Sequence, residues 1–232
     1  MTTCLSDFIK DHSLDFLCLQ ETKKNKITPS FLRKIDTYNI FEWNWVPSMG
    51  KAGGMLCGVK KNKLEVVSWS LGKFIMQVVV FMLKKVYWAL LNVYGAAHDE
   101  QKEEFLYELA SFCSHLSVPY IVGGDFNILR HCGEKNKRMV PSQYVDRFNA
   151  IINTMCLREI FIEGGLYTWS NNQSHPTLEK LDRILMSIDW EDLFPLVTVR
   201  KLVRDLSDHN SLLLSTNSNR PNTPNPVNSG WK

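Results

Sequence analysis

Apolar residues in the first half of the chain recur at two different spacings. Leu5, Phe8 and Ile9 follow the period of an α-helix, and the apolar run at residues 14–19 is typical of a buried strand. Apolar and β-branched residues then dominate residues 55–93, where polar breaks divide the sequence into four segments. The pattern predicts a helix, a strand, and four further strands joined as hairpins.

The second half of the chain alternates helical stripes with short apolar runs. A helix that Asp99 can cap is followed by a strand at residues 120–122 and by a helix that starts at Ser142. Short strands are then predicted at residues 166–170, 181–186, 197–203 and 211–215. Because strands outnumber helices and both recur throughout, we expect an α+β fold, a two-sheet β-sandwich with flanking helices.

Composition separates a folded region from a tail. The chain has 232 residues and is 44% hydrophobic, which is enough for one large core, so we expect a single domain at residues 1–215. Residues 216–232 are rich in Asn, Pro, Ser and Thr. Such a segment cannot bury enough apolar surface to offset the entropy lost on ordering. We therefore predict a disordered tail or linker there.

The sequence contains no segment that would place the protein in a membrane or export it. Its longest apolar run, near residues 74–83, is about half of the roughly twenty residues that a membrane helix needs. The N-terminus lacks the basic-then-apolar order of a secretory signal. Six widely spaced cysteines are typical of reduced thiols rather than of a zinc site or a disulfide scaffold. We expect an intracellular protein without membrane contact.

The charge pattern is compatible with a polyanionic partner but does not require one. The formal net charge is +3, and basic residues gather at residues 23–26, 60–63 and 135–138. A basic cluster is most often a solvated loop. Three clusters that flank the acidic motifs described next would also suit contacts with phosphate groups.

Four polar clusters stand where predicted strands end. They are residues 20–22 (QET), 124–127 (GDFN), 181–183 (LDR) and 207–209 (SDH). Each cluster alone has a simpler explanation as a turn or a cap. Strand ends meet at one rim of a sandwich, and together the clusters supply carboxylates, an amide and a histidine. Hard oxygen ligands bind magnesium, and a histidine can stabilise the charge that develops on a phosphate during hydrolysis.

These clusters belong to a longer series of motifs. In order along the chain the motifs are LCLQET at 17–22, NVYG at 92–95, GGDFN at 123–127, LDR at 181–183 and SDH at 207–209. Over about residues 5–215 the chain resembles the endonuclease/exonuclease/phosphatase superfamily. Residues 165–170 (GLYTWS), a polar loop and LDRIL at 181–185 are similar to the apurinic-type endonuclease domain of plant non-LTR retrotransposons. The resemblance implies a four-layer α/β/β/α, DNase I-like sandwich.

The resemblance also implies roles for individual residues. Glu21 would be the principal ligand of a bound Mg²⁺, or alternatively Mn²⁺, and Asp208 would lie close to the metal. Asp125 would orient or deprotonate the attacking water. Asn127 would hydrogen-bond the phosphate, and His209 would contact the phosphate from the other side. We therefore expect one metal-dependent hydrolytic site at the rim of the sandwich.

Two further roles follow from the same resemblance. Asp182 would fix the orientation of His209 and raise its pKa. Tyr94 would contact the phosphate or the leaving group through its hydroxyl, although a strand-end aromatic without a catalytic role is the alternative. The loop at residues 171–180 would lie beside the metal and contact the substrate. We expect three substrate-binding residues in and just before this loop: Trp169, Asn171 and Asn172.

The sequence departs from the family pattern at its N-terminus. Family members begin with a strand that ends in an asparagine, placed just before the helix that here opens at about Thr3. This sequence has no such strand, so we expect a sandwich without its first strand and a site that lacks one side chain. The proline that is usual in relatives near Ala96 is also absent, which changes only a loop.

Three interpretations of function stay open. The first is a Mg-dependent phosphodiesterase, an endonuclease that nicks DNA and derives from a non-LTR retrotransposon. Its partners would be DNA and the reverse transcriptase region of the intact element, and we expect a monomer that is nuclear if functional. The second is a phosphatase or exonuclease of the same superfamily. The third is a catalytically impaired retroelement remnant without an enzymatic role.

Overall fold

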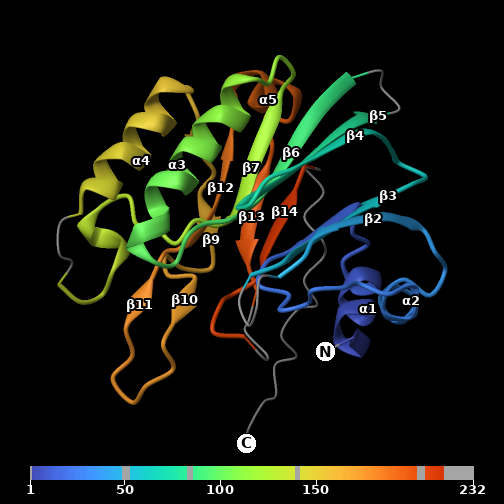
Figure 1. Cartoon of the computed structure of the whole chain (residues 1–232), viewed down its shortest axis with the longest axis horizontal. Coiled ribbons are helices and arrows are strands. Elements are labelled where there is room, and N and C mark those ends of the chain that lie inside the picture. Colours follow the sequence, from blue (N-terminus) through green and yellow to red (C-terminus); the bar gives the residue numbers. More distant parts are fainter. Residues whose placement is uncertain (1, 49–52, 83–85, 139–141, 203–206, 217–232) are drawn as a thin grey trace, which may run out of the picture.

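Helices are interspersed among runs of strands along the chain (Figure 1), and the computed structural model describes residues 2–48, 53–82, 86–138, 142–202 and 207–216. The helices are α1 (Thr2–Asp11), α2 (Pro29–Ile35), α3 (Asp99–Ser114), α4 (Gln143–Thr154) and α5 (Ile188–Leu193), with a 3₁₀ turn at Cys132–Glu134. The longer strands are β1 (Phe16–Leu19), β2 (Phe41–Val46), β3 (Met55–Lys60), β4 (Leu64–Leu71), β5 (Ile75–Met82), β6 (Val86–Tyr94), β7 (Tyr120–Asp125), β12 (Asp182–Met186), β13 (Thr198–Lys201) and β14 (Leu212–Ser215). The short strands are β8 (Arg158–Glu159), β9 (Ile162–Glu163), β10 (Trp169–Ser170) and β11 (Leu178–Glu179).

Four layers stack in the order helix, sheet, sheet, helix. A six-stranded sheet has the strand order β4-β5-β6-β7-β12-β8, and α3 and α4 cover one of its faces (Figure 1). Its other face packs on two three-stranded sheets, β1-β3-β2 and β14-β13-β9. Helices α1 and α2 pack on the outer face of β1-β3-β2. The predicted α+β sandwich with flanking helices is confirmed.

The central strands read as continuous apolar runs because both of their faces are buried. In β6, Ala89, Leu91 and Val93 join the cluster that packs against α3 and α4. Trp88 and Leu90 join the cluster between the sheets. Successive side chains of a strand point to opposite faces, so a strand between two layers needs apolar residues at every position. This run is the strongest fold signal in the sequence.

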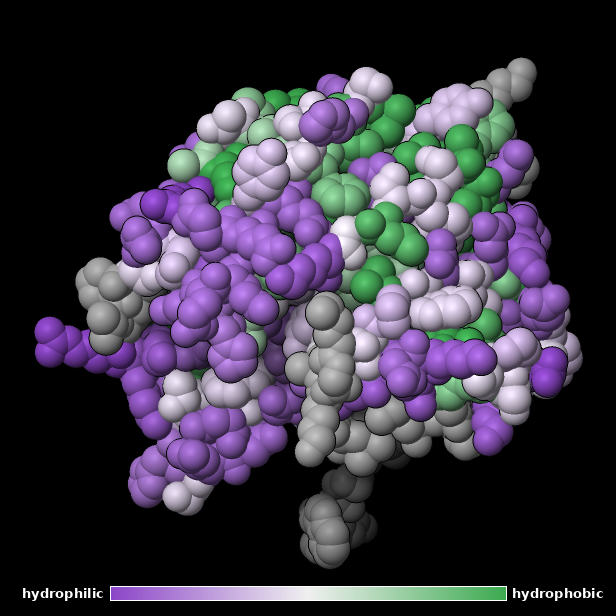
Figure 2. Space-filling model, in the orientation of Figure 1, coloured by the Kyte–Doolittle hydropathy of each residue, from purple (hydrophilic) through white to green (hydrophobic). Residues whose placement is uncertain are grey.

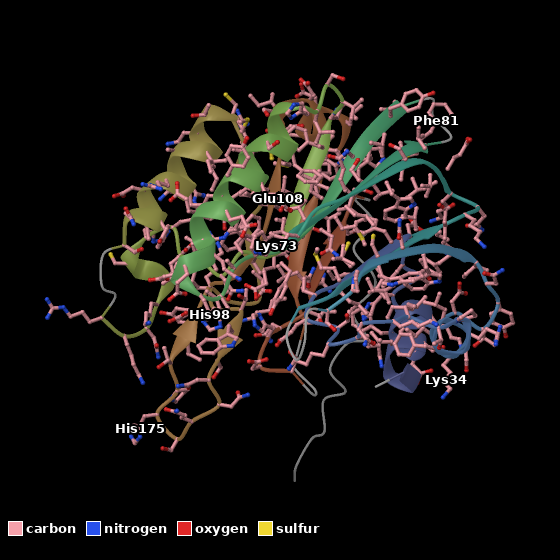
Figure 3. The ribbon with its side chains drawn as sticks, in the orientation of Figure 1. Lys34, Lys73, Phe81, His98, Glu108 and His175 are labelled. Atoms are coloured by element: carbon pink, nitrogen blue, oxygen red, sulfur yellow. The ribbon has the colours of Figure 1, made fainter. Side chains whose placement is uncertain are left out.

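A carboxylate on α3 anchors the start of β5. The side chain of Glu108 accepts backbone N–H bonds from Lys73, Phe74 and Ile75 at 2.9 to 3.1 Å. Figure 3 shows Glu108 and Lys73 together at the junction of the helix layer and the six-stranded sheet. These bonds satisfy N–H groups that the sheet leaves unpaired, and they fix α3 along the sheet.

The structure corrects part of the predicted strand pairing. Strands β3 and β4 were expected to form a hairpin, but β3 pairs with β1 and β2 whereas β4 pairs with β5. The turn at residues 61–63 therefore carries the chain from one layer to the other. Sequence patterns also missed α2 and β2 completely. The predicted strand at 166–170 shrinks to β10, and the predicted tail lies outside the described residues, apart from Thr216.

β1 and β14 are edge strands of the two smaller sheets that pack on the six-stranded sheet. Among the described residues β1 pairs only with β3, and β14 pairs only with β13. The additional first strand of the family stays a prediction. None of the helices in the described ranges has the length and hydropathy that would let it cross a membrane.

A buried ion network holds β12 to the loop that follows β7. The guanidinium of Arg183 is fully buried and bonds both oxygens of Glu134 at 3.0 Å. It also bonds Glu159 at 3.3 Å and the backbone carbonyl of Ile128 at 3.1 Å. Arg130 also bonds Glu159, at 2.7 Å. Burial alone would raise the pKa of the Glu159 carboxyl, but the nearby cations outweigh burial and lower the pKa to about 2. Ion pairs therefore join β12 to β8 and to the loop after β7.

Replacing Glu134 with Ala should destabilise the fold by about 3 kcal/mol, because the fully buried guanidinium of Arg183 loses its bidentate partner and, among carboxylates, retains only the longer bond to Glu159. The free energy of unfolding in urea measures this. The control is Glu103→Ala, which removes an ion pair with Arg147 whose side chains are about half exposed. That change should cost no more than about 1 kcal/mol. Equal effects of the two substitutions would contradict the assignment of Arg183 as a structural centre.

Candidate active site

Strand register brings three predicted site residues into one row. β6 and β7 run parallel and β12 runs antiparallel to β7, which pairs Tyr94 with Asp125 and Asp125 with Asp182. The ends of β6 and β7 and the start of β12 therefore share one rim of the six-stranded sheet. The expectation that strand-end clusters meet at a rim is confirmed for these residues.

The close approach of β7 to β6 at the rim requires a glycine at position 124. Gly124 has a φ of +140°, and a Cβ built there would lie 2.1 Å from the carbonyl oxygen of Val93 on β6. It would also lie 3.1 Å from Nε2 of Gln20, which donates a 2.5 Å hydrogen bond to Oδ1 of the buried Asn92. The bond between Gln20 and Asn92 ties the segment after β1, and hence Glu21, to the six-stranded sheet.

Asn127 holds Asp125 in place. Its backbone N–H donates to one Asp125 carboxylate oxygen at 2.9 Å, and its side-chain amide donates to the other at 3.0 Å. The same amide donates to the carbonyl of Gly95 at 3.0 Å, and its φ of 52° is in the left-handed region that asparagine tolerates. In this structure Asn127 acts on Asp125, and its expected contact with phosphate stays a prediction.

His209 lies between the two aspartates. Its Nδ1 bonds Oδ2 of Asp182 at 2.8 Å, and its Nε2 lies 3.9 Å from Oδ2 of Asp125. Burial alone would lower the pKa of the imidazole. The bond to Asp182 and the charges of Asp182, Asp125 and Asp208 outweigh it and raise the pKa to about 9. At neutral pH this imidazole is protonated, so Nδ1 donates to Asp182 and the N–H of Nε2 can donate to another acceptor.

Asp125 is the most perturbed carboxylate of the row. Burial raises its pKa to about 7, and the neighbouring Asp182 carboxylate acts in the same direction. His209 and the N–H of Asn127 oppose this rise. A carboxylate that titrates near neutrality can both accept and release a proton, which is the property that a general base needs.

Glu21 occupies a strained turn beside this row. It has a φ of 50° and Lys23 has a φ of 54°, which are unusual for residues other than glycine. Bonds of 3.0 Å from Thr22 N to the carbonyl of Gly54 and from Lys23 N to that of Gly53 hold the turn. The side chain of Glu21 is 41% exposed, and its carboxylate lies 3.2 Å from Nζ of Lys23. The side chain of Glu21 is therefore open to solvent.

Tyr94 reports on the electrostatic field of the rim. Burial, followed by the charges of Glu21, Asp125 and Asp208, raises its pKa to about 12. Three carboxylates from distant segments therefore lie close enough to act on one hydroxyl. The phenol stays neutral and can donate a hydrogen bond.

Trp169 and Asp208 are joined to each other. The indole N–H donates to Oδ2 of Asp208 at 2.9 Å, and a backbone bond of 3.0 Å joins Ser170 N to the Asp208 carbonyl. Burial alone would raise the pKa of Asp208. The hydrogen bond from Trp169 and the charge of His209 outweigh burial and lower that pKa. No sequence pattern indicates this bond. Because the indole N–H is used here, Trp169 can meet a substrate only with its ring.

Asn171 and Asn172 belong to a hairpin. Oδ1 of Asn171 accepts from Thr177 N at 2.9 Å and so closes the loop between β10 and β11, whereas Asn172 is exposed with a φ of 53°. The hairpin projects from the body of the protein (Figure 1), and Figure 3 shows His175 at its tip. Substrate contacts by Trp169, Asn171 and Asn172 stay predictions.

The donor set fits a hard divalent cation. One atom each of Asp125, Asp182 and His209 lie within 4.8 Å of one another. A protonated imidazole has no lone pair for a metal, so His209 is better placed to donate to a phosphate. The carboxylates that converge on Tyr94 are oxygen donors of the kind that Mg²⁺ prefers. We expect the metal to bind at Glu21, with Asp208 close to it.

The sequence comparisons agree with this geometry. The chain matches the model of the endonuclease/exonuclease/phosphatase family over residues 2–209 and belongs to that family. No curated protein matches the chain by sequence.

Solved structures with the same fold include nucleic-acid enzymes. The AP endonuclease LMAP from Leishmania major is 15% identical with a TM-score of 0.69, over 90% of this chain and 80% of that one. The endonuclease domain of TRAS1, a telomere-specific non-LTR retrotransposon, is 16% identical with a TM-score of 0.68, over 92% and 91%. TDP2 from D. rerio, complexed with a single-strand DNA product, is 14% identical with a TM-score of 0.59, over 91% and 89%. At these identities the likeness shows the DNase I-like fold alone.

The high pKa of His209 should depend on Asp182. In Asp182→Asn the pKa of the imidazole should fall from about 9 toward its ordinary 6.5, because the bonded carboxylate is lost. NMR titration of histidine-labelled protein without metal measures this, with the His209 signal assigned from His209→Ala. Asp189→Asn, on the exposed face of α5, is the control and should leave the His209 midpoint in place. A midpoint that remains near 9 in Asp182→Asn would contradict the pairing.

Proposed function

We propose that the protein is a metal-dependent phosphodiesterase that nicks DNA. The observation that carries the proposal is the row of Asp182, His209 and Asp125, in which a protonated imidazole stands beside a carboxylate whose pKa is near 7. Such a pair can hold a phosphate oxygen and an attacking water at the same time. Hydrolysis of a phosphodiester requires both functions.

Each residue of the rim takes one part of the reaction. Asp125, held by Asn127, accepts the proton of the attacking water. His209 donates from Nε2 to a non-bridging phosphate oxygen, and the neutral hydroxyl of Tyr94 donates a further bond to the phosphate. A divalent cation, when bound at Glu21 and Asp208, supplies charge that stabilises the phosphate oxygens.

Three considerations favour an endonuclease over the alternatives. The hairpin of β10 and β11 stands beside the rim, where it can meet a duplex groove. The motifs at 165–170 and 181–185 resemble those of retrotransposon endonucleases, and we infer a non-LTR retrotransposon origin from them. The intact geometry around Asp125 and His209 favours an enzyme over a remnant. A phosphatase or exonuclease would share this centre and differ in its substrate surface.

Nicking of supercoiled DNA should require Mg²⁺ or Mn²⁺, because the proposed ligands Glu21 and Asp208 are hard oxygen donors. EDTA should abolish nicking, and either cation should restore it. Asp125→Asn and His209→Ala should each lower the rate by roughly 10² to 10⁴, which is the contribution of a general base or of a charge-stabilising group. Plasmid relaxation measured on gels gives these rates.

The matched controls are Asp189→Asn and His12→Ala, which change the same residue types at exposed positions on α5 and just after α1, away from the rim. Both should keep the parental rate. Nicking without a metal, or parental rates in Asp125→Asn and His209→Ala, would overturn the proposed chemistry. A parent protein that fails to nick DNA with either cation would favour the remnant interpretation.

The hairpin should select where DNA is cut. Replacing residues 172–176 with a Gly-Ser turn should change the nicked positions on a labelled duplex while the metal requirement persists, because the loop lies outside the catalytic row. The same replacement at residues 61–63, at the end of β3 opposite to the site, should leave the pattern unchanged. Sequencing gels of the nicked strand compare the patterns. An unchanged pattern in the first variant would make the hairpin a connector only.

A further inference from the structure

A pocket of about 260 Å³ opens next to the catalytic row, and the function proposed above gives it no role. It lies between the start of α3, the start of α4 and the hairpin of β10 and β11. Figure 3 shows the same region, with His98 before α3 on the side of the molecule that carries His175. Its lining includes the polar residues Lys102, Asn127, Lys135, Arg138, Tyr144 and Glu179.

The pocket is positively charged. It has three cations and one carboxylate in its lining, and Lys135 bonds that carboxylate, Glu179, at 2.6 Å. Lys102 lies 2.8 Å from Asp99 and 5.6 Å above the ring of Tyr144, with 17% of its side chain exposed. Arg138 is exposed, and no hydrogen bond or ion pair joins its side chain to the described residues. The lining therefore retains an excess of positive charge.

Asn127 joins the pocket to the catalytic row. Its amide bonds Asp125 at 3.0 Å, and it also lines the pocket together with Ile128 and Leu129. Phosphates recur about every 3.4 Å along the axis on each strand of duplex DNA. A strand with one phosphate at Asp125 and His209 therefore has further phosphates within reach of the pocket. Figure 2 shows mainly hydrophilic side chains over this part of the surface.

We propose that the pocket of Lys102, Lys135 and Arg138 binds a backbone phosphate of the strand that is cut, adjacent to the scissile phosphate. This inference rests on the proposed function and adds a substrate class to it. A second phosphate site favours a polynucleotide over a small phosphate monoester. Arg138, which has five N–H donors and no protein acceptor among the described residues, is the best placed to bond a phosphate.

The test is DNA binding in EDTA, where no cleavage interferes. Fluorescence anisotropy with a labelled duplex gives affinity across a series of salt concentrations. Lys102→Ala/Arg138→Ala should weaken binding about tenfold and reduce the slope of log affinity against log salt by about 1, the value for one lost phosphate contact. Arg33→Ala/Lys34→Ala, which removes the same charge from exposed positions on α2, should leave the slope unchanged. Inorganic phosphate at the same ionic strength should not displace the duplex.

Equal slopes in the parent and the pocket variant, or equal losses in the two double variants, would overturn the phosphate site. So would complete displacement by inorganic phosphate. Arg138→Glu alone, at an exposed position, repeats the test if the double variant unfolds. With Mg²⁺ present, the loss in kcat/KM should be at least about tenfold larger for DNA than for a small phosphodiester, since only DNA carries the second phosphate. A parent that binds with the expected slope but never nicks contradicts the proposed function while the phosphate site stands.

Discussion

Two buried carboxylates that face each other across adjacent strands are the constraint on which this site depends. The pairing of β7 with β12 places Asp125 opposite Asp182, and both are buried. Two negative charges in such a position repel each other unless one is protonated or a cation lies between them. His209 is that cation, bonded to Asp182 and 3.9 Å from Asp125. His209 lowers the pKa of Asp125, so removing the imidazole would favour the protonated form of Asp125.

The scaffold separates a second set of charges from this one. Arg183 follows Asp182 on β12, so its side chain points to the opposite face of the strand, where Glu134 and Glu159 neutralise it. A step of one residue along β12 therefore separates the carboxylate at the rim from the guanidinium in the loop network. Glu134 and Lys180 belong to segments that border the proposed phosphate pocket. Structural and catalytic charges thus share one strand without neutralising each other.

Sequence patterns predicted the residues of the row better than the contacts among them. The apolar runs of β7 and β12 located Asp125 and Asp182 at a rim, because strand geometry is local, whereas only the family resemblance indicated Tyr94. The pairing of β3 was predicted wrongly, because a short polar turn has the same composition in a hairpin and in a crossover between layers. The aromatic and polar residues of β2 alternate, which is the pattern of a half-buried strand, so β2 was predictable although it was missed. The bond from Asn127 N–H to Asp125 is local, of the kind that Asp accepts from the residue two positions further on, whereas the bond from Asn127 to the Gly95 carbonyl depends on tertiary geometry.

Proton binding links this site to the stability of the fold before any cation binds. Asp125 and His209 both have raised pKa values in the folded chain, so both favour the folded state below their ordinary pKa values. The contribution of Asp125 is lost as pH rises from 3.8 to about 7, and that of His209 as pH rises from 6.5 to about 9. Between about 7 and 9 the site therefore holds an ionised Asp125 beside a protonated His209. This is the charge state that the proposed reaction uses, and a cation near Glu21 would extend it to lower pH by favouring the ionised form of Asp125.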